Sequence, residues 1–203
     1  MSVLRILLPA LGAVAVIGAW PLAAAASPEI TARAKKFLAA HEAKVRPLEI
    51  KGAEAWWRAN TSGKAEDFKA KEEAQNQLDA ALADPAAFKE AKALKDALKE
   101  IDDPVLARAV AVIYLAYLEK QVDTELLKKM TAKANAVEKA FNEFRPKVDG
   151  KEVTDNQVRK ILRTSTLSEK RKEAWEASKK VGEAVEADLK ELVKLRNEAA
   201  RKL

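Results

Sequence analysis

The sequence predicts an all-α fold, and two observations carry that prediction. Ala, Glu, Lys and Leu, which are good helix formers, dominate every segment after the first 26 residues. No stretch shows the sustained alternation of polar and apolar residues that is typical of a half-buried strand. We therefore expect a multi-helix array of antiparallel and angled helices joined by short connections.

Capping signals and helix breakers set the expected limits of the helices. Three N-cap residues followed by Pro and two capping boxes mark helix starts, namely Ser27-Pro28, Asp84-Pro85, Asp103-Pro104, Thr154 with Gln157, and Thr166 with Glu169. Pro47, Ser62-Gly63 and Pro146–Gly150 indicate breaks. Together these signals predict seven helices, at 28–46, 48–60, 63–83, 85–100, 104–121, 124–145 and 154–202, with a break of the last helix near Thr164–Thr166 as an alternative.

The last predicted helix has a continuous apolar face. Apolar or small residues recur every three or four positions, at Ala174, Ser178, Val181, Val185, Leu189, Leu192, Leu195, Ala199 and Leu203. A helix of this length ordinarily ends in a Gly or Asn cap, whereas this pattern continues to the last residue. We therefore expect its packing partner to lie outside this sequence, and we interpret residues 27–203 as the truncated front part of a larger helical protein.

One helix differs from the others in composition. Val105 to Leu118 is apolar almost all round and is interrupted only by Arg108. Such a helix is normally buried on every side, so we expect its neighbours to surround it. It is shorter than the roughly 20 residues that cross a bilayer, and a membrane hairpin is the alternative interpretation.

The first 26 residues have the pattern of a signal peptide. A single Arg5 precedes an apolar segment, and Ala24-x-Ala26 fits the small-residue rule for cleavage. A retained membrane anchor is the alternative, but Pro9, Pro21 and the short apolar core disfavour it. We therefore expect an exported protein, periplasmic or secreted, with no stable membrane span after cleavage of residues 1–26.

Charge and Cys content exclude several classes of function. The formal net charge is +6, and Lys and Glu alternate along nearly every segment. This pattern predicts a mildly basic, solvated surface and no nucleic-acid partner, because a nucleic-acid interface would cluster its cations. The chain has no Cys, which excludes thiol catalysis, thiolate zinc sites and iron–sulfur ligation.

The histidine content argues against a catalytic centre within this chain. His41 is the sole His, and His41-Glu42 begins like a zinc-binding His-Glu-x-x-His helix, but Val45 stands where the second His would be. We interpret His41 as an exposed helix residue. No nucleophilic triad, Gly-rich phosphate loop or dinucleotide motif is present. We therefore predict no catalytic, cofactor-binding or metal-binding residue and no cofactor in this chain.

The aromatic residues are few and suited to packing. Trp56 and Trp57 are adjacent, so only one of them can face squarely inward, and we expect core packing, with cleft lining as the alternative. Tyr114 and Tyr117 share one face of the apolar helix, where their hydroxyls can reach a polar rim.

Four segments suggest a family relationship. They are Phe37-Leu38 through Trp56-Trp57-Arg58-Ala59-Asn60-Thr61-Ser62-Gly63, then Phe141-Asn142-Glu143-Phe144-Arg145 with Asp155-Asn156 and Ile161-Leu162-Arg163-Thr164-Ser165, then Arg171-Lys172-Glu173-Ala174-Trp175-Glu176-Ala177-Ser178 with Gly182, and Leu192 through Asn197-Glu198-Ala199-Ala200-Arg201. In order and spacing they resemble the N-terminal part of bacterial metallopeptidases of the angiotensin-converting-enzyme type (peptidyl-dipeptidase A). Related helical oligopeptidases share the Arg-x-x-Ala-Trp-like helix, so the subfamily stays open.

The resemblance implies an ellipsoidal helical enzyme with a deep central cleft, whose zinc-binding residues lie downstream of the matched segment. It implies zinc in the complete enzyme, peptide substrates, and a lid role for the N-terminal helices. The leading hypothesis is thus an inactive front part of an exported peptidase that releases dipeptides from peptide C-termini, and its missing partner is the C-terminal catalytic part. Two alternatives are a non-enzymatic periplasmic helical adaptor complete at Leu203, and an inhibitor or chaperone that binds a partner helix.

Overall fold

Helices account for most of residues 26–203, the part of the chain that the computed structural model describes. They are α1 (Pro28–Ser62), α2 (Ala65–Leu82), α3 (Pro85–Asp96), the short 3-10 helix η1 (Leu98–Glu100), α4 (Pro104–Leu118), α5 (Thr124–Glu143), α6 (Asp155–Thr164), α7 (Ser168–Lys179) and α8 (Val181–Lys202). The predicted all-α, multi-helix fold is confirmed. The expected signal peptide at 1–26 lies, apart from its last residue, outside the described residues.

Most of the predicted helix starts are confirmed by their caps. The Asp84 Oδ1 accepts from the Ala86 N–H at 2.9 Å, and Asp103 caps α4 in the same way. Thr154 forms the expected capping box at the start of α6. The second expected box is wrong, because α7 begins one position later, after Leu167, with no side-chain cap.

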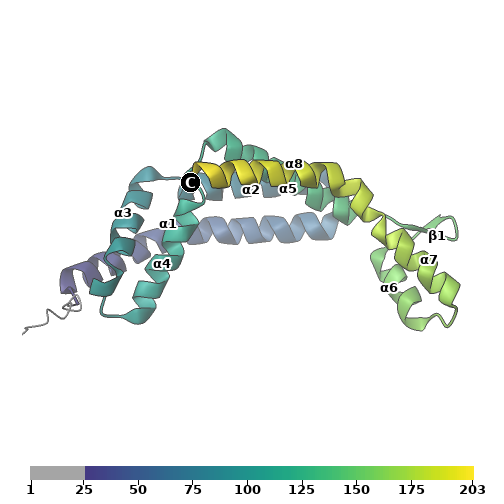
Figure 1. The fold of residues 1–203 in the computed structure, drawn as a ribbon, viewed down its shortest axis with the longest axis horizontal. Helices are drawn as coiled ribbons and strands as arrows, with labels where there is room; N and C mark the ends of the chain where they lie inside the picture. Colours follow the sequence, from purple (N-terminus) through teal and green to yellow (C-terminus); the bar gives the residue numbers. More distant parts are fainter. Residues whose placement is uncertain (1–25) are drawn as a thin grey trace, which may run out of the picture.

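The break predicted at Pro47 is wrong, because α1 continues through that residue to Ser62. Pro47 and Ala43 both lie on the exposed side of the helix, so the carbonyl group that loses its N–H partner faces solvent. Val45, on the opposite side, is buried against other helices. Figure 1 shows that α1 changes direction along its length instead of ending there. Packing of the buried side thus outweighs the local cost of Pro.

Replacing Pro47 with Ala is expected to stabilise the protein by roughly 2 kcal/mol. Relief of the helix-interior Pro contributes about 3 kcal/mol, and greater freedom of the unfolded chain offsets about 1 kcal/mol of that gain. Urea unfolding followed by circular dichroism measures the change. A variant less stable than the parent would show that the bend at Pro47 is needed for packing.

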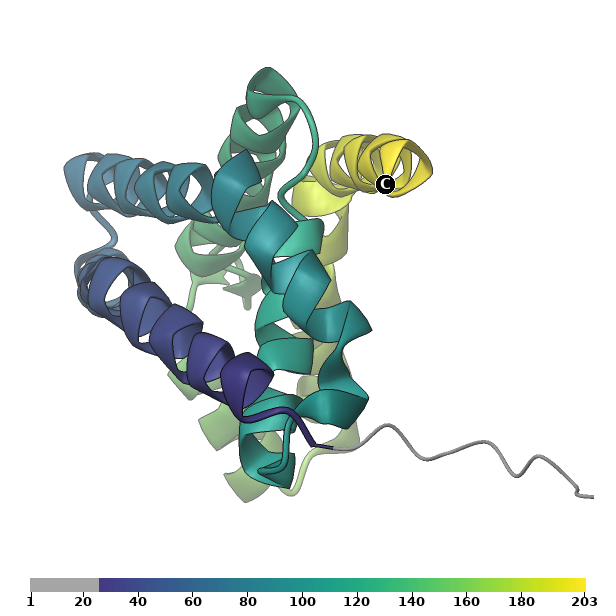
Figure 2. The same cartoon turned by 90° about the vertical axis from the view of Figure 1, so that its left-hand side faces the viewer.

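The long helices form a layered body (Figures 1 and 2). α1 packs along α2, α2 packs on α5, and α5 packs on α8. The hairpin of α3 and α4 lies across the first half of α1. Two apolar clusters fill the contact between the hairpin and the long helices. One cluster consists of Ala34, Leu94, Ile101, Leu106 and Val110, and the other of Val45, Leu82, Ala91 and Tyr117.

The segment before the last long helix forms a separate unit that projects from one end of the body (Figure 1). Here α6 pairs with α7, and a two-stranded hairpin of β1 (Lys147–Val148) and β2 (Lys151–Glu152) packs on α7. The sequence analysis found no strand, so this hairpin is a correction. Its turn places Asp149 and Gly150 at φ 52° and φ 72°, the left-handed pair that suits a two-residue hairpin loop.

The predicted helix 154–202 is three helices. The alternative break is confirmed, since α6 ends at Thr164 and α7 begins at Ser168. A further break follows Lys179, and α8 then begins at Val181 and returns along α5. The apolar face expected to lack a packing partner in this chain packs on α5 through Val185, Leu192 and Ala199, so that expectation is wrong for these residues. Leu189 and Leu203, expected on the same face, are exposed.

The apolar helix α4 is not buried on every side, contrary to expectation. Leu106, Val110 and Tyr117 face the core, whereas Val105 and Leu115 are 77% and 57% exposed. A stripe of exposed apolar residues therefore follows the outer side of α4. A comparable stripe on α8 consists of Leu189, Val193 and Leu203. Within residues 26–203, no helix combines the length and the apolar character needed to cross a membrane.

Candidate functional site

A cavity lined mainly by polar side chains lies between α2 and α5. It has a volume of about 330 Å³, and three residues from outside these two helices also line it. They are Trp56 of α1, Lys120 of the α4–α5 connection and Arg196 of α8. Residues from five parts of the chain therefore meet at this polar cavity, and its walls carry both carboxylates and cations.

Asp79 anchors one end of the cavity. Its carboxylate is buried and lies 3.1 Å from the ammonium of Lys120, with further hydrogen bonds from Gln75 at 2.9 Å and Thr131 at 3.2 Å. Burial lowers the pKa of Lys120, but attraction to Asp79 and hydrogen bonds to Glu119 and Asp79 outweigh it, so the pKa is raised. Lys120 therefore stays charged. The ion pair ties α2 to the α4–α5 connection, and the hydrogen bond from Thr131 ties α2 to α5.

Glu138 anchors the other end of the cavity. It accepts hydrogen bonds from Lys71 of α2 and, at 2.9 Å, from Asn60 of α1. Asn142 donates in turn to the amide oxygen of Asn60. Burial raises the pKa of Glu138, but the hydrogen bonds from Lys71 and Asn60 outweigh it, and the pKa is lowered. These contacts fix the C-terminal end of α1 against α2 and α5.

Asn135 lies on the wall of the cavity and is buried. Its amide nitrogen donates to the Phe68 carbonyl at 3.0 Å and to Glu72 at 3.3 Å. Its amide oxygen has no hydrogen-bond partner among the described residues. A buried acceptor of this kind is ordinarily satisfied by a small donor such as a water molecule, which a polar cavity of this size can hold.

The two adjacent Trp residues do not pack in the core, and the main expectation for them is wrong. Trp56 is 48% exposed and lines the polar cavity, in agreement with the alternative that one Trp lines a cleft. Trp57 is 67% exposed and lies on a shallow neighbouring surface. Both residues lie near the end of α1, where α2 covers only one side. Sequence spacing places them on different faces but does not show which face is covered.

His41 is half-buried, which corrects the expectation of an exposed helix residue. Its Nδ1 lies 3.2 Å from the hydroxyl of Tyr117, and the Phe37 ring packs against it. The Tyr117 hydroxyl therefore finds a partner in His41, while Tyr114 stacks on Phe88. Burial lowers the pKa of His41, and the nearby carboxylates of α1 only partly offset that effect.

The His41 environment predicts a loss of stability at mildly acidic pH. Because the folded-state pKa is below the unfolded value of about 6.5, the unfolded chain binds the proton more readily. The stability that depends on neutral His41 is therefore fully present above about pH 6.5. It falls as the pH is lowered from there toward the folded-state pKa. Urea unfolding of the protein and of His41→Gln between neutral and mildly acidic pH measures it, and a parent and variant with equal pH dependence would contradict it.

The described residues do not fit a zinc ion. No group of three or more His, Cys, Asp or Glu side chains in residues 26–203 is placed to hold a metal. His41 is directed at Tyr117, and the cavity carboxylates Asp79 and Glu138 are engaged by cations. The ion pairs and hydrogen bonds of the polar cavity connect α1, α2 and α5 to one another, and we call this set of contacts the polar joint.

The long layered helices, connected through the polar joint, define an all-α protein. The family model described as angiotensin-converting enzyme matches residues 28–203, from the start of α1 to the end of the chain. The chain therefore belongs to this peptidase family. A search of curated proteins and one of solved structures each found no match.

Proposed function

We propose that this chain is the N-terminal, lid-side part of an exported zinc metallopeptidase that releases dipeptides from the C-termini of peptides. The family match over residues 28–203 is the observation that carries the proposal. The zinc site, the substrate-binding residues and the peptidase activity would belong to a C-terminal catalytic part. Zinc is expected there and not in this chain.

The exposed apolar stripes support a packing partner for α4 and α8. Val105, Val112 and Leu115 lie exposed on α4, and Leu189 and Val193 lie exposed on α8. A soluble monomer rarely exposes large contiguous apolar surface without a functional reason. We assign these two stripes to contact with the catalytic part of the same polypeptide.

The arrangement of the long helices suits a lid. The body is elongated, and α1 extends along its length (Figure 1). A rigid layer of this kind can cover a cleft and restrict entry to flexible peptides, with closure governed by motion of the whole layer. The polar joint at Asp79 and Glu138 would keep α1, α2 and α5 moving together.

The second candidate is a non-enzymatic periplasmic helical adaptor. The well-formed helical body favours it, as does the lack of a metal-ligand group among the described residues. It differs from the leading proposal in what the apolar stripes contact, since an adaptor would present them to a separate protein.

The chain alone is expected to bind no stoichiometric zinc and to release no dipeptides. The physical reason is that a zinc site needs three or four converging ligands, and no group of three or more His, Cys, Asp or Glu side chains is placed to hold a metal in residues 26–203. Calorimetric titration with zinc and a peptide hydrolysis assay measure the two properties. A tight one-to-one zinc site, or dipeptide release from the purified chain, would overturn this prediction.

The reading frame beyond the codon for Leu203 tests the proposal itself. We expect the frame to continue and to encode a His-Glu-x-x-His sequence, and we expect the longer product to hydrolyse peptides in a zinc-dependent way. A stop codon at that point, together with a monomeric product that shows no exposed apolar surface to a hydrophobic dye, would favour the adaptor.

A further inference from the structure

The net positive charge of the described chain is concentrated in one unit of the fold. Residues 145–180, which include the β hairpin, α6 and α7, contain eleven Lys and Arg against six Asp and Glu. Residues 27–144 contain 20 of each sign, and residues 181–203 contain five of each. The whole excess of +5 that follows residue 26 therefore lies in this segment, which we call the basic module.

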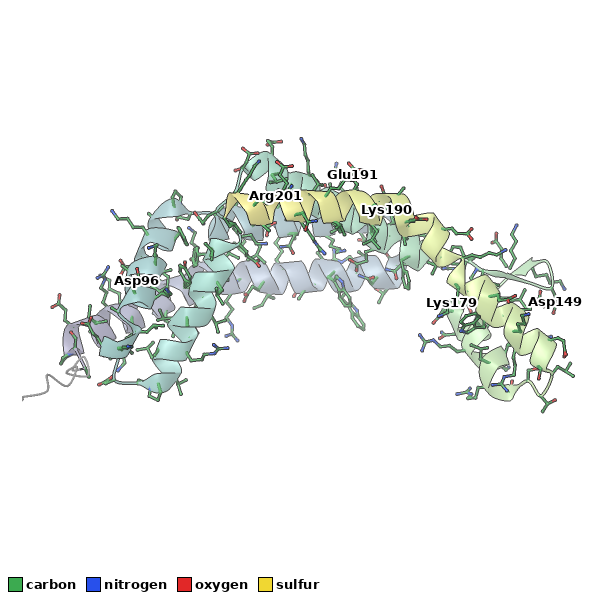
Figure 3. All side chains as sticks on the ribbon, in the orientation of Figure 1. Asp96, Asp149, Lys179, Lys190, Glu191 and Arg201 are labelled. Carbon is green, nitrogen blue, oxygen red and sulfur yellow. The ribbon has the colours of Figure 1, made fainter. Side chains whose placement is uncertain are left out.

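The basic module stands apart from the layered body. It has a small core of its own, made by Val148, Val158, Ala174 and Ala177. Figures 1 and 3 show it projecting from the end of the body opposite to α3 and α4, with Asp149 and Lys179 both within it. A projecting unit of this shape can approach a surface without hindrance from the long helices.

The cations of the basic module are available to a partner. All eleven Lys and Arg side chains of the module are exposed. Among the described residues, Lys160, Arg163 and Arg171 have no ion pair, and Lys172 has only a weak, exposed contact with Glu176 at 3.8 Å. Glu169 and Glu173 are the other acids of α7, and Glu173 is engaged by the backbone N–H of Asp149. Solvent, and not a carboxylate, therefore surrounds these three cations.

Exposed apolar residues lie among these cations. Leu167, in the loop that joins α6 to α7, is 62% exposed, and Trp175 is 52% exposed. Arg171, Lys172 and Trp175 line one shallow groove of about 290 Å³ with Leu162 and Ser168. Lys179 lies over the Trp175 ring, with its Nζ 5.5 Å from the centroid. The groove thus places the Trp175 ring beside the cations of Arg171 and Lys172, with Lys179 over the ring.

We propose that the basic module docks the protein on an anionic membrane surface. Its cations would face lipid phosphates, and Leu167 and Trp175 would enter the interfacial region, where Trp and Leu side chains with adjacent Lys and Arg are favoured. Such binding is peripheral and needs no membrane-spanning helix. The proposal is independent of the peptidase activity, because it rests only on the charge, exposure and placement of this module.

The shape of the module favours a membrane over an acidic protein. Its groove is shallow, and the module that carries Leu167 and Trp175 projects from one end of the molecule (Figure 1). An acidic protein partner would need a complementary surface that reaches into the groove, whereas a lipid surface adapts to it. Each Lys or Arg near an anionic surface strengthens binding by about fivefold, so an excess of five charges gives measurable adsorption.

The test measures partition onto vesicles with the chain from Ser27 onward, which contains every described element and lacks the apolar segment at 1–26. We expect binding to vesicles of phosphatidylcholine mixed with phosphatidylglycerol, and little binding to phosphatidylcholine alone. The variant R171E/K172E is expected to bind the mixed vesicles at least tenfold more weakly. The matched control K35E/K36E makes the same change of net charge at two exposed residues of α1 that have no ion pair within residues 26–203. This control should retain at least half of the parent's binding.

A second measurement follows Trp175 directly. When Trp56 and Trp57 are replaced by Phe, Trp175 is the sole Trp from Ser27 onward, and its emission should shift to shorter wavelengths on mixed vesicles. Circular dichroism confirms that each variant is folded. Absent binding to mixed vesicles, equal losses in the two charge variants, or an unshifted Trp175 emission would each overturn the membrane proposal. The first of these results would leave an acidic protein as the partner to seek.

Discussion

Asp79→Ala is expected to lower the free energy of unfolding by about 3 kcal/mol, the largest effect of any single polar substitution in this chain. The substitution leaves the largely buried ammonium of Lys120 with only the exposed Glu119 as a carboxylate partner, and it removes the acceptor for Gln75 and Thr131. Removing one member of a buried pair costs several kcal/mol because the remaining charge is uncompensated. Chemical unfolding followed by far-ultraviolet circular dichroism measures the loss.

Two controls separate this effect from a general effect of acidic residues. Glu66→Ala removes an exposed carboxylate of the same helix whose contact with Lys64 is 3.7 Å, and it should leave stability unchanged within error. The double variant D79L/K120M should regain most of the lost stability, since an apolar pair needs no charge compensation. A loss in the double variant as large as in Asp79→Ala would contradict the pairing.

Leu94→Ala is expected to destabilise the protein by about 3 kcal/mol, within the range of roughly 2 to 5 kcal/mol found for buried Leu. Leu94 is fully buried in the cluster where α3 and α4 cross the start of α1. The substitution removes apolar contacts and leaves a cavity, because rigid helix backbones on three sides cannot close it. The midpoint of thermal or urea unfolding reports the effect.

The matched control is the same substitution at Leu189, which lies exposed on α8. Leu189→Ala in this chain should change stability by less than about 0.5 kcal/mol, as surface substitutions usually do. Equal losses at the two positions would mean that α8 is packed differently from the structure.

The fold class could be predicted from the sequence because the helix signals are local. N-cap residues with their Pro neighbours determine the starts of α3 and α4, and the sequence contains them directly. The break between α6 and α7 was likewise indicated near Thr164. These features depend on residues within one turn of each other, which is why sequence inspection finds them.

The main errors in the fold arise from tertiary context. Pro47 predicts a helix end by local rules, but α2 and α4 pack along α1 and keep it continuous. The β hairpin has a readable signal in Asp149-Gly150, which favours a two-residue turn, but its strands are too short to show alternation. Trp56 and Trp57 show that sequence spacing assigns a residue to a face of a helix. It does not show whether another helix packs against that face.

The polar cavity was not predicted, because its residues are far apart in the sequence. Asp79 and Lys120 lie on different elements, and Asn60 meets Glu138 only after α1, α2 and α5 have packed. The signal that sequence inspection could have used is the set of polar residues on otherwise apolar faces of α2 and α5. His41 was assigned to solvent for the same reason, since Tyr117 is remote in the sequence.

The charge distribution was missed for a different reason. Lys and Glu alternate locally throughout the chain, so each short segment seems balanced. A count of Lys and Arg against Asp and Glu in each structural unit, in contrast, places the whole excess of positive charge at residues 145–180. The boundaries of that unit come from the structure, and the asymmetry becomes apparent only after they are known.

The central claim is that the apolar stripes of α4 and α8 are covered by a catalytic part of the same polypeptide. Because the chain has no Cys, a single Cys introduced at Val112 or Val193 reports the accessibility of its stripe without background. The deciding measurement is the rate of maleimide labelling in this chain and in the product of the extended reading frame. We expect labelling to be at least tenfold slower in the extended product, while a Cys at the exposed Glu66 labels equally in both. Equal rates at Val112 and Val193 in the two proteins would contradict the account.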